Sequence, residues 1–207
     1  MGRSLAALSA LLGAILEGGC QPAAHPIGPP DTSAIGTYEL AFCRRSCAFD
    51  DSASVRIRGI LVLDSMKVAV PDSQAEYFAV ANAGSWATDL MGHNPGAACF
   101  ILHEPGRPTR NSHGLPVIRG VPAVALTNWR YDADSGLLLE LYRSPDAAFR
   151  MEAHVSEGRL VGRTEQGGMR GEGDLGVRYV TGRRIGTPDP ELCLAAAPGR
   201  WARDSLR

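Results

Sequence analysis

A chain of 207 residues is long enough for one domain with a hydrophobic core, and no change of composition divides it in two. Its 21 basic and 22 acidic residues give a formal net charge of −1 at pH 7. Proteins that neutralise many phosphates carry a clear basic excess, so this balance argues against nucleic acid as a partner. The 24 glycines and 14 prolines are scattered, which is typical of a folded, turn-rich protein.

The first twenty residues have the pattern of an export signal. Arg3 precedes an apolar run over 5–16, and the small residues Gly18 and Gly19 lead to Cys20. The run is shorter than the roughly 20 apolar residues that a transmembrane helix needs. We therefore expect residues 1–20 to be a signal peptide and the protein to be exported.

Cys20 is the expected point of lipid attachment. The residues before it resemble the lipobox of bacterial lipoproteins, in which the cysteine is acylated, although Glu17 stands where an aliphatic residue is usual. Gln21 follows the cysteine in place of the aspartate of inner-membrane lipoproteins, so the resemblance implies an outer-membrane or periplasmic lipoprotein. Secretion as a soluble protein is the alternative. Residues 21–35 then form a flexible tether.

Four cysteines remain in the exported part of the chain: Cys43, Cys47, Cys99 and Cys193. An even number in an exported protein favours two disulfides, with three possible pairings. A bridge between Cys43 and Cys47 is geometrically easy, and Cys99 and Cys193 would then close a long loop. Zinc binding is a weaker alternative, because zinc modules usually show two paired ligand sets.

Apolar and polar residues alternate in short segments between turn residues, and this period of two predicts β-strands. Residues Ser156-Glu157-Gly158 are a strong hairpin signal. The predicted strands are 36–43, 55–63, 98–104, 122–131, 137–142, 149–155, 159–166 and 175–184. Residues 73–92 could hold one short helix.

These strands predict an all-β domain over 36–187, followed by a C-terminal tail over 188–207. With tight turns and no crossover helices, the expected architecture is an antiparallel meander of about eight strands, closed as a lipocalin-like barrel. Closure removes exposed strand edges, which favours the barrel over a β-sandwich, the alternative.

Several short motifs resemble those of a group of uncharacterised exported proteins and lipoproteins of GC-rich bacteria. They are Gly36-x-Tyr38-x-Leu40, Cys43-x3-Cys47, Gly59-x-Leu61-x-Leu63, Ala98-Cys99-Phe100 and Gly182-Arg183-Arg184-Ile185-Gly186. That resemblance implies no activity. The opening Gly36-x-Tyr38 is also similar to lipocalins, which have tryptophan at the position of Tyr38. Their later signature does not match Thr127-Asn128-Trp129, so the likeness implies architecture and not ligand binding.

Two sets of residues are candidates for a site, and the arginines suggest a third. If the barrel encloses a cavity, the expected lining residues are Tyr38, Phe42, Leu61, Phe149 and Met151. A metal could bind to the group His93, His103, His113 and Glu104, although these residues lack paired ligand spacing. The pairs Arg44-Arg45 and Arg183-Arg184 could form one basic patch if the first and last strands are neighbours, but a solvated rim is the favoured interpretation.

Because no catalytic constellation stands out, a non-enzymatic role is favoured. The hypothesis is a lipid-anchored envelope protein without a cofactor, attached to the membrane through an N-terminal lipid, that binds a small apolar ligand or an envelope protein. A purely structural or adhesion module differs from it only by partner. The alternative is a metal-assisted hydrolase that uses the histidine-rich region.

Overall fold

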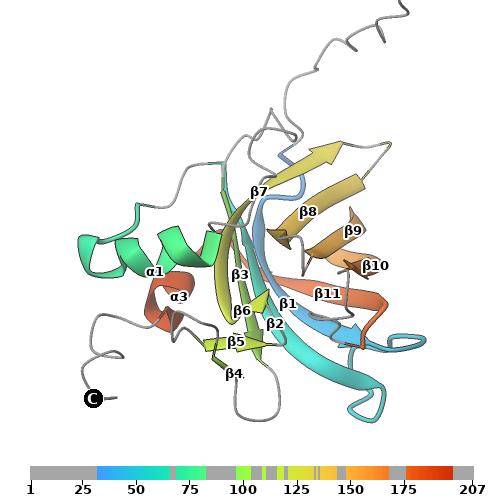
Figure 1. Cartoon of the computed structure of the whole chain (residues 1–207). Helices are drawn as coiled ribbons and strands as arrows, with labels where there is room; N and C mark the ends of the chain where they lie inside the picture. The colour runs from blue at the N-terminus through green and yellow to red at the C-terminus, as the bar shows by residue number, and fades with distance from the viewer. Residues whose placement is uncertain are drawn as a thin grey trace, which may run out of the picture.

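The computed structural model describes residues 32–65, 69–82, 97–103, 109–110, 116–118, 121–132, 134, 136–143, 148–167 and 176–197. Figure 1 shows a curved antiparallel sheet with two short helices together on one side, beside β3 and β7, and with β9, β10 and β11 on the other side.

Eight strands form the barrel, and their bounds are close to those that the alternation predicts. They are β1 (Gly36–Cys43), β2 (Val55–Leu63), β3 (Ala97–His103), β7 (Val124–Asp132), β8 (Gly136–Arg143), β9 (Ala148–Ser156), β10 (Arg159–Gly167) and β11 (Tyr179–Gly186). The predicted all-β antiparallel meander is therefore confirmed.

The ring is closed by the first and last strands. In register, Tyr38 of β1 is paired with Leu61 of β2 on one side and with Arg184 of β11 on the other. The full order is β1-β11-β10-β9-β8-β7-β3-β2, in which each strand is hydrogen-bonded to its neighbours. The closed barrel is thus the alternative that the pairing supports.

The ladder between β7 and β8 is short. It runs from the pair Asp132 and Gly136 to the pair Trp129 and Leu139, whereas the earlier part of β7 is paired with β3. The connection between β3 and β7 forms a separate three-stranded sheet, which the sequence pattern did not predict. Its strands are β4 (Thr109–Arg110), β5 (Pro116–Ile118) and β6 (Val121–Pro122), and β6 lies near β8. Each strand has only two or three residues, too few for alternation to stand out.

The interior is filled by the inward-facing side chains of all eight strands. Phe42, Phe100 and Phe149 meet there, with ring centroids 5.7 to 6.1 Å apart. Trp129 is also buried, and its indole N–H donates to the carbonyl of Asp64 at 3.1 Å. Burial of large apolar side chains is the main force that stabilises such a barrel.

A second core lies outside the barrel, between β2, β3 and β7 and the helices α1 (Asp72–Asn82) and α3 (Glu191–Ala196). Tyr77 and Phe78 of α1 are buried in it, as is Cys193 of α3. The sequence predicted a short helix within 73–92. That helix ends at Asn82 within the described residues, and α3 was not predicted.

The folded domain begins before Gly36, within the segment that was predicted to be a tether. Ala34 is fully buried and Ile35 packs against the core, so the described end of the 21–35 segment belongs to the barrel. This turn was assigned to the tether because its composition is that of a linker, and only the barrel provides the surface on which it packs.

Candidate functional site

The two ends of the barrel differ. At the end where β1 begins, called the closed end, Arg184 ties the chain before β1 to β11. Its guanidinium donates hydrogen bonds to the carbonyls of Ser33 (2.8 Å) and Ile35, and it lies 5.5 Å from the centre of the Tyr38 ring. The Tyr38 hydroxyl donates to the carbonyl of Ala34 at 2.8 Å. These contacts fold residues 32–35 against the interior.

Burial raises the pKa of Tyr38 above its ordinary value of 10.0, and the nearby Arg184 guanidinium opposes this with a smaller effect. The phenol therefore stays neutral at physiological pH. We interpret the contact between Arg184 and Tyr38 as structural, because the guanidinium also donates to the carbonyls of Ser33 and Ile35 and so joins the covering segment to β1 and β11.

The five predicted cavity residues do come together inside the barrel. Their exposed fractions are 0% or 1%, so other protein atoms cover them completely. They belong to one core cluster with Phe100 and Trp129. No surface of these five side chains is open to a ligand in this conformation, and a ligand cavity at them stays a prediction. The five residues are Tyr38, Phe42, Leu61, Phe149 and Met151.

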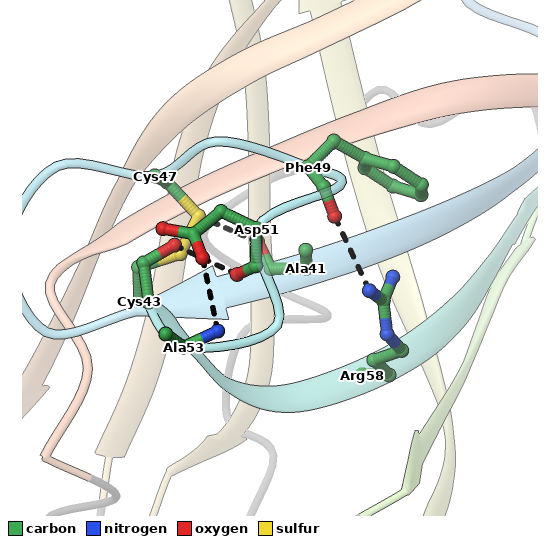
Figure 2. Close-up of a disulfide and its surroundings, with 8 residues drawn as sticks. Ala41, Cys43, Cys47, Phe49, Asp51, Ala53 and Arg58 are labelled. Carbon is green, nitrogen blue, oxygen red and sulfur yellow. Dashed lines mark hydrogen bonds between the residues drawn. A yellow bond between two sulfur atoms is a disulfide. The ribbon is translucent and has the colours of Figure 1, made fainter.

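At the opposite end, called the disulfide end, the loop from β1 to β2 is held by the bridge between Cys43 and Cys47, whose Cα atoms are 5.2 Å apart. The Sγ atom of Cys47 lies 3.3 Å from the carbonyl oxygen of Ala41. Figure 2 shows this loop, in which the Asp51 carboxylate accepts a hydrogen bond from the Ala53 amide at 3.0 Å. The loop is thus fixed at both of its ends.

Phe49, at the middle of the loop, folds back onto the outer face of the sheet. Its carbonyl accepts a hydrogen bond from Arg58 of β2 at 3.2 Å, as Figure 2 shows. Two guanidinium groups face its ring, Arg58 at 5.2 Å and Arg183 at 4.6 Å. Arg183 also forms a two-pronged hydrogen bond with the Glu39 carboxylate, at 2.9 and 3.2 Å. Arg58 and Arg183 are therefore engaged in holding the loop.

A different group of arginines lies around Tyr179, where β11 begins. Cys43 is opposite Tyr179 in register, so Arg44 and Arg45 follow directly beside it, and both are exposed. On the other side, Arg163 of β10 is opposite Tyr179, with its guanidinium 5.9 Å from the ring centre. We call Arg44, Arg45, Arg163 and Tyr179 the arginine–tyrosine rim.

Backbone hydrogen bonds through Arg178 join the strands of this rim. The Arg178 amide donates to the carbonyl of Cys43 at 2.8 Å, and the Thr164 amide donates to the carbonyl of Arg178 at 3.0 Å. The ends of β1, β10 and β11 are therefore linked at one place. The positions of Arg44 and Arg163 follow from that linkage and from the disulfide, which restricts the residues between Cys43 and Cys47.

The grouping of arginines that the sequence suggested is wrong in one respect. The first and last strands are neighbours, as expected, but they are antiparallel. Arg183 and Arg184 are opposite Glu39 and Tyr38, toward the closed end, while Arg44 and Arg45 follow Cys43 at the disulfide end. The two pairs thus stand at opposite ends of the strand pair, and no single patch joins them through the register.

Both expected disulfides are present. Besides Cys43 with Cys47, Cys99 of β3 is bonded to Cys193 of α3, with Cα atoms 6.1 Å apart. Gln74 of α1 donates from Nε2 to the carbonyl of Leu194 at 2.7 Å, close to this bridge. The described start of the C-terminal tail, up to Ala197, is thereby fastened to the barrel wall. Of the three possible pairings, the observed one is the pairing expected if Cys43 and Cys47 form the local bridge.

Only one of the four candidate metal ligands lies in the described part of the chain. His103, the last residue of β3, is exposed, and His93, Glu104 and His113 lie outside the described residues. Within the described ranges, His, Cys, Asp and Glu side chains nowhere gather in a group of three that could hold a metal ion. The metal site stays a prediction.

Cys20 and most of the tether also lie outside the described residues. Among the described helices, neither is long and apolar enough to cross a membrane. The two disulfides are compatible with an exported protein, because such bonds persist in oxidising compartments.

No protein-family model, curated protein or solved structure matches this chain. The resemblance to exported lipoproteins and the architectural likeness to lipocalins thus remain expectations from the sequence. The geometry of the site defines a disulfide-bonded eight-stranded β-barrel with an arginine–tyrosine rim.

Proposed function

We propose that this protein is an exported, lipid-anchored envelope protein that acts by contact through its outer surface and does not catalyse a reaction. The observation that carries the proposal is the packed interior. The side chains best placed to line a cavity are at most 1% exposed and contact one another. With the interior occupied, recognition falls to the outside of the barrel.

The outside of the barrel is divided into two unlike regions. Helices α1 and α3 cover β2, β3 and β7, whereas the exposed side chains of β9 to β11 are open to solvent. A surface that contacts another component must be accessible, and the β9–β11 wall meets that requirement. Export, the lipid on Cys20 and the envelope partner are parts of the proposal that rest on the sequence pattern and on the disulfides.

Cell fractionation tests the anchor. We expect the natural protein to sediment with membranes and the variant Cys20→Ser to appear in the soluble fraction, because the thioether lipid cannot form on serine. Mass spectrometry of the mature N-terminus should show an acylated Cys20. An unmodified N-terminus located elsewhere would remove the anchor from the proposal.

Native mass spectrometry tests the packed interior. Protein purified without denaturant should carry no bound apolar compound in stoichiometric amount, since other protein atoms already cover the interior side chains. A co-purifying lipid or other apolar ligand that is lost when Met151 is changed to Trp would favour the ligand-binding alternative. Metal analysis of the same preparation tests the hydrolase alternative, which requires a bound metal ion.

A further inference from the structure

We propose that the arginine–tyrosine rim and the adjacent Val161 form a docking surface for an anionic lipid membrane. The inference deepens the proposed contact function and rests on it. Its starting point is the exposure of Tyr179 (38%) and Val161 (60%) on the outer face of neighbouring strands. Val161 is opposite Thr181, so it lies diagonally next to Tyr179.

Charge gives the first reason for an anionic partner. Arg163 lies 5.9 Å from the centre of the Tyr179 ring, Arg44 and Arg45 follow the residue that is opposite Tyr179 in register, and all three arginines are exposed. Arginine stems can lie along an apolar surface while the guanidinium groups reach phosphate oxygens, with which they form strong hydrogen bonds. A tyrosine among arginines matches the boundary between headgroups and acyl chains, where amphipathic rings are favoured.

The nearest carboxylates cancel only part of this charge. Glu152 of β9 is opposite Arg163 in register, and Glu165 is exposed on the same face of β10. Arg150 is bonded to Glu152 at 2.7 Å and is opposite Glu165, so these three residues together carry one net negative charge against the three arginines of the rim. Asp50 and Asp51 belong to the same loop as Arg44, but they follow Phe49, on the part of the loop that leads to β2. The rim itself therefore keeps an excess of positive charge.

The reach of the chain supports a membrane as the occupant. Twelve residue steps separate Cys20 from residue 32, the first described residue, and they span at most about 40 Å. A nine-residue strand such as β10 is about 30 Å long. A lipid on Cys20 would therefore allow the arginine–tyrosine rim to reach the same bilayer. The anchor and the rim would then contact the same membrane.

Vesicle co-sedimentation of the exported form with Cys20→Ser tests the surface without the contribution of an acyl chain. We expect binding to vesicles of phosphatidylcholine mixed with phosphatidylglycerol, weaker binding at high salt, and no binding to phosphatidylcholine alone. Arg163→Gln should lower the affinity about fivefold, and the pair Arg44→Gln with Arg45→Gln about 25-fold. Tyr179→Ser should also weaken binding.

The matched control is Arg159→Gln, which removes the same charge from the same exposed face of β10, about 13 Å toward the closed end. It should bind like the parent, and unchanged thermal unfolding shows that each variant is folded. Equal losses for Arg159→Gln and Arg163→Gln, or no binding to anionic vesicles at low salt, would overturn the inference. Binding to a soluble anionic polymer but not to vesicles would also overturn it, and would leave the proposed contact function standing.

Discussion

Glycine is required at some interior positions because neighbouring backbone leaves no room for a side chain. At Gly162 of β10, an added Cβ would overlap the carbonyl oxygen of Glu152 and come within 2.6 Å of the Ala153 Cα. At Gly182 of β11, it would lie 2.6 Å from a methyl group of Leu40. These glycines allow the strands to approach and large residues to interdigitate.

Gly162→Ala should therefore destabilise the protein by about 2 kcal/mol, because the β9 backbone would have to move. The control is Gly186→Ala at the end of β11, where no atom lies within 4 Å of the added methyl group. That change should stay within about 0.5 kcal/mol. Urea unfolding of both variants measures the difference, and equal stabilities would contradict the close approach of β9 and β10.

Tyr77 gives a pH-dependent contribution to stability. Its hydroxyl donates to the carbonyl of Val124 at 3.1 Å, and burial raises its pKa to about 12 from an ordinary 10.0. In the unfolded chain the phenol loses its proton near pH 10, whereas in the folded chain it keeps the proton until near pH 12. The contribution is therefore complete below pH 10 and is lost between pH 10 and 12, at about 1.4 kcal/mol per pH unit.

Tyr77→Phe should remove most of this pH dependence and cost about 1 kcal/mol at neutral pH, from the lost hydrogen bond to Val124. The measurement is the free energy of unfolding at about pH 9 and about pH 11. A smaller slope should remain, because burial raises the pKa of Tyr38 in the same direction. If the variant kept the whole slope of the parent, the docking of α1 through Tyr77 would be wrong.

At the scale of elements, the two disulfides differ in the length of chain they close. Cys43 and Cys47 are 4 residues apart, and Cys99 and Cys193 are 94 apart. In the chain-entropy model the first contributes about 2 kcal/mol and the second about 4.7 kcal/mol. The long bridge also holds α3 against β3, and Gln74 of α1 donates a hydrogen bond to the Leu194 carbonyl of α3.

Replacing both Cys99 and Cys193 with alanine should consequently lower the free energy of unfolding by about 3 kcal/mol more than replacing both Cys43 and Cys47. Hydrogen exchange should show α3 and α1 opening first in the Cys99→Ala, Cys193→Ala variant while the barrel strands stay protected. A larger loss from the short bridge would mean that the loop at the disulfide end contributes more to folding than its length suggests.

Arg184 of β11 holds the segment before β1 in place through its hydrogen bonds to the Ser33 and Ile35 carbonyls. Arg184→Gln should release residues 32–35, because glutamine cannot reach both the Ser33 and Ile35 carbonyls or stack on Tyr38. Limited proteolysis should then cleave near this turn. Arg183→Gln, one residue away on the opposite face and bonded to Glu39 at the surface, should leave the turn protected. Cleavage at equal rates would show that Arg184 does not hold the segment.

At the scale of the whole molecule, the barrel is asymmetric around its axis. Beside β3 and β7 the helices form a second layer, whereas on the far side neither of the described helices covers the wall of β9 to β11 (Figure 1). One end is closed by Arg184 and residues 32–35, and the other carries the disulfide loop and the arginine–tyrosine rim. This asymmetry limits where a partner can make contact and gives the vesicle experiment its internal control.

The sequence by itself determined the strands and their inward faces. Tyr38, Leu40 and Phe42 occupy alternate positions of β1 and so share one face, which is a local property set by the two-residue period of a strand, and β1 and β2 begin and end where this period predicts. The number of cysteines, together with their spacing, favoured the bridges that are present.

Only the tertiary structure decided which residues from distant strands meet. Arg163 and Tyr179 are neighbours because of the register of β10 and β11, and Arg44 joins them because β1 pairs with β11. Register depends on packing and on closure of the ring, which no local pattern encodes. For the same reason the sequence grouped Arg183 with Arg44, did not predict α3, and could not tell that Tyr38 and Phe42 fill the interior.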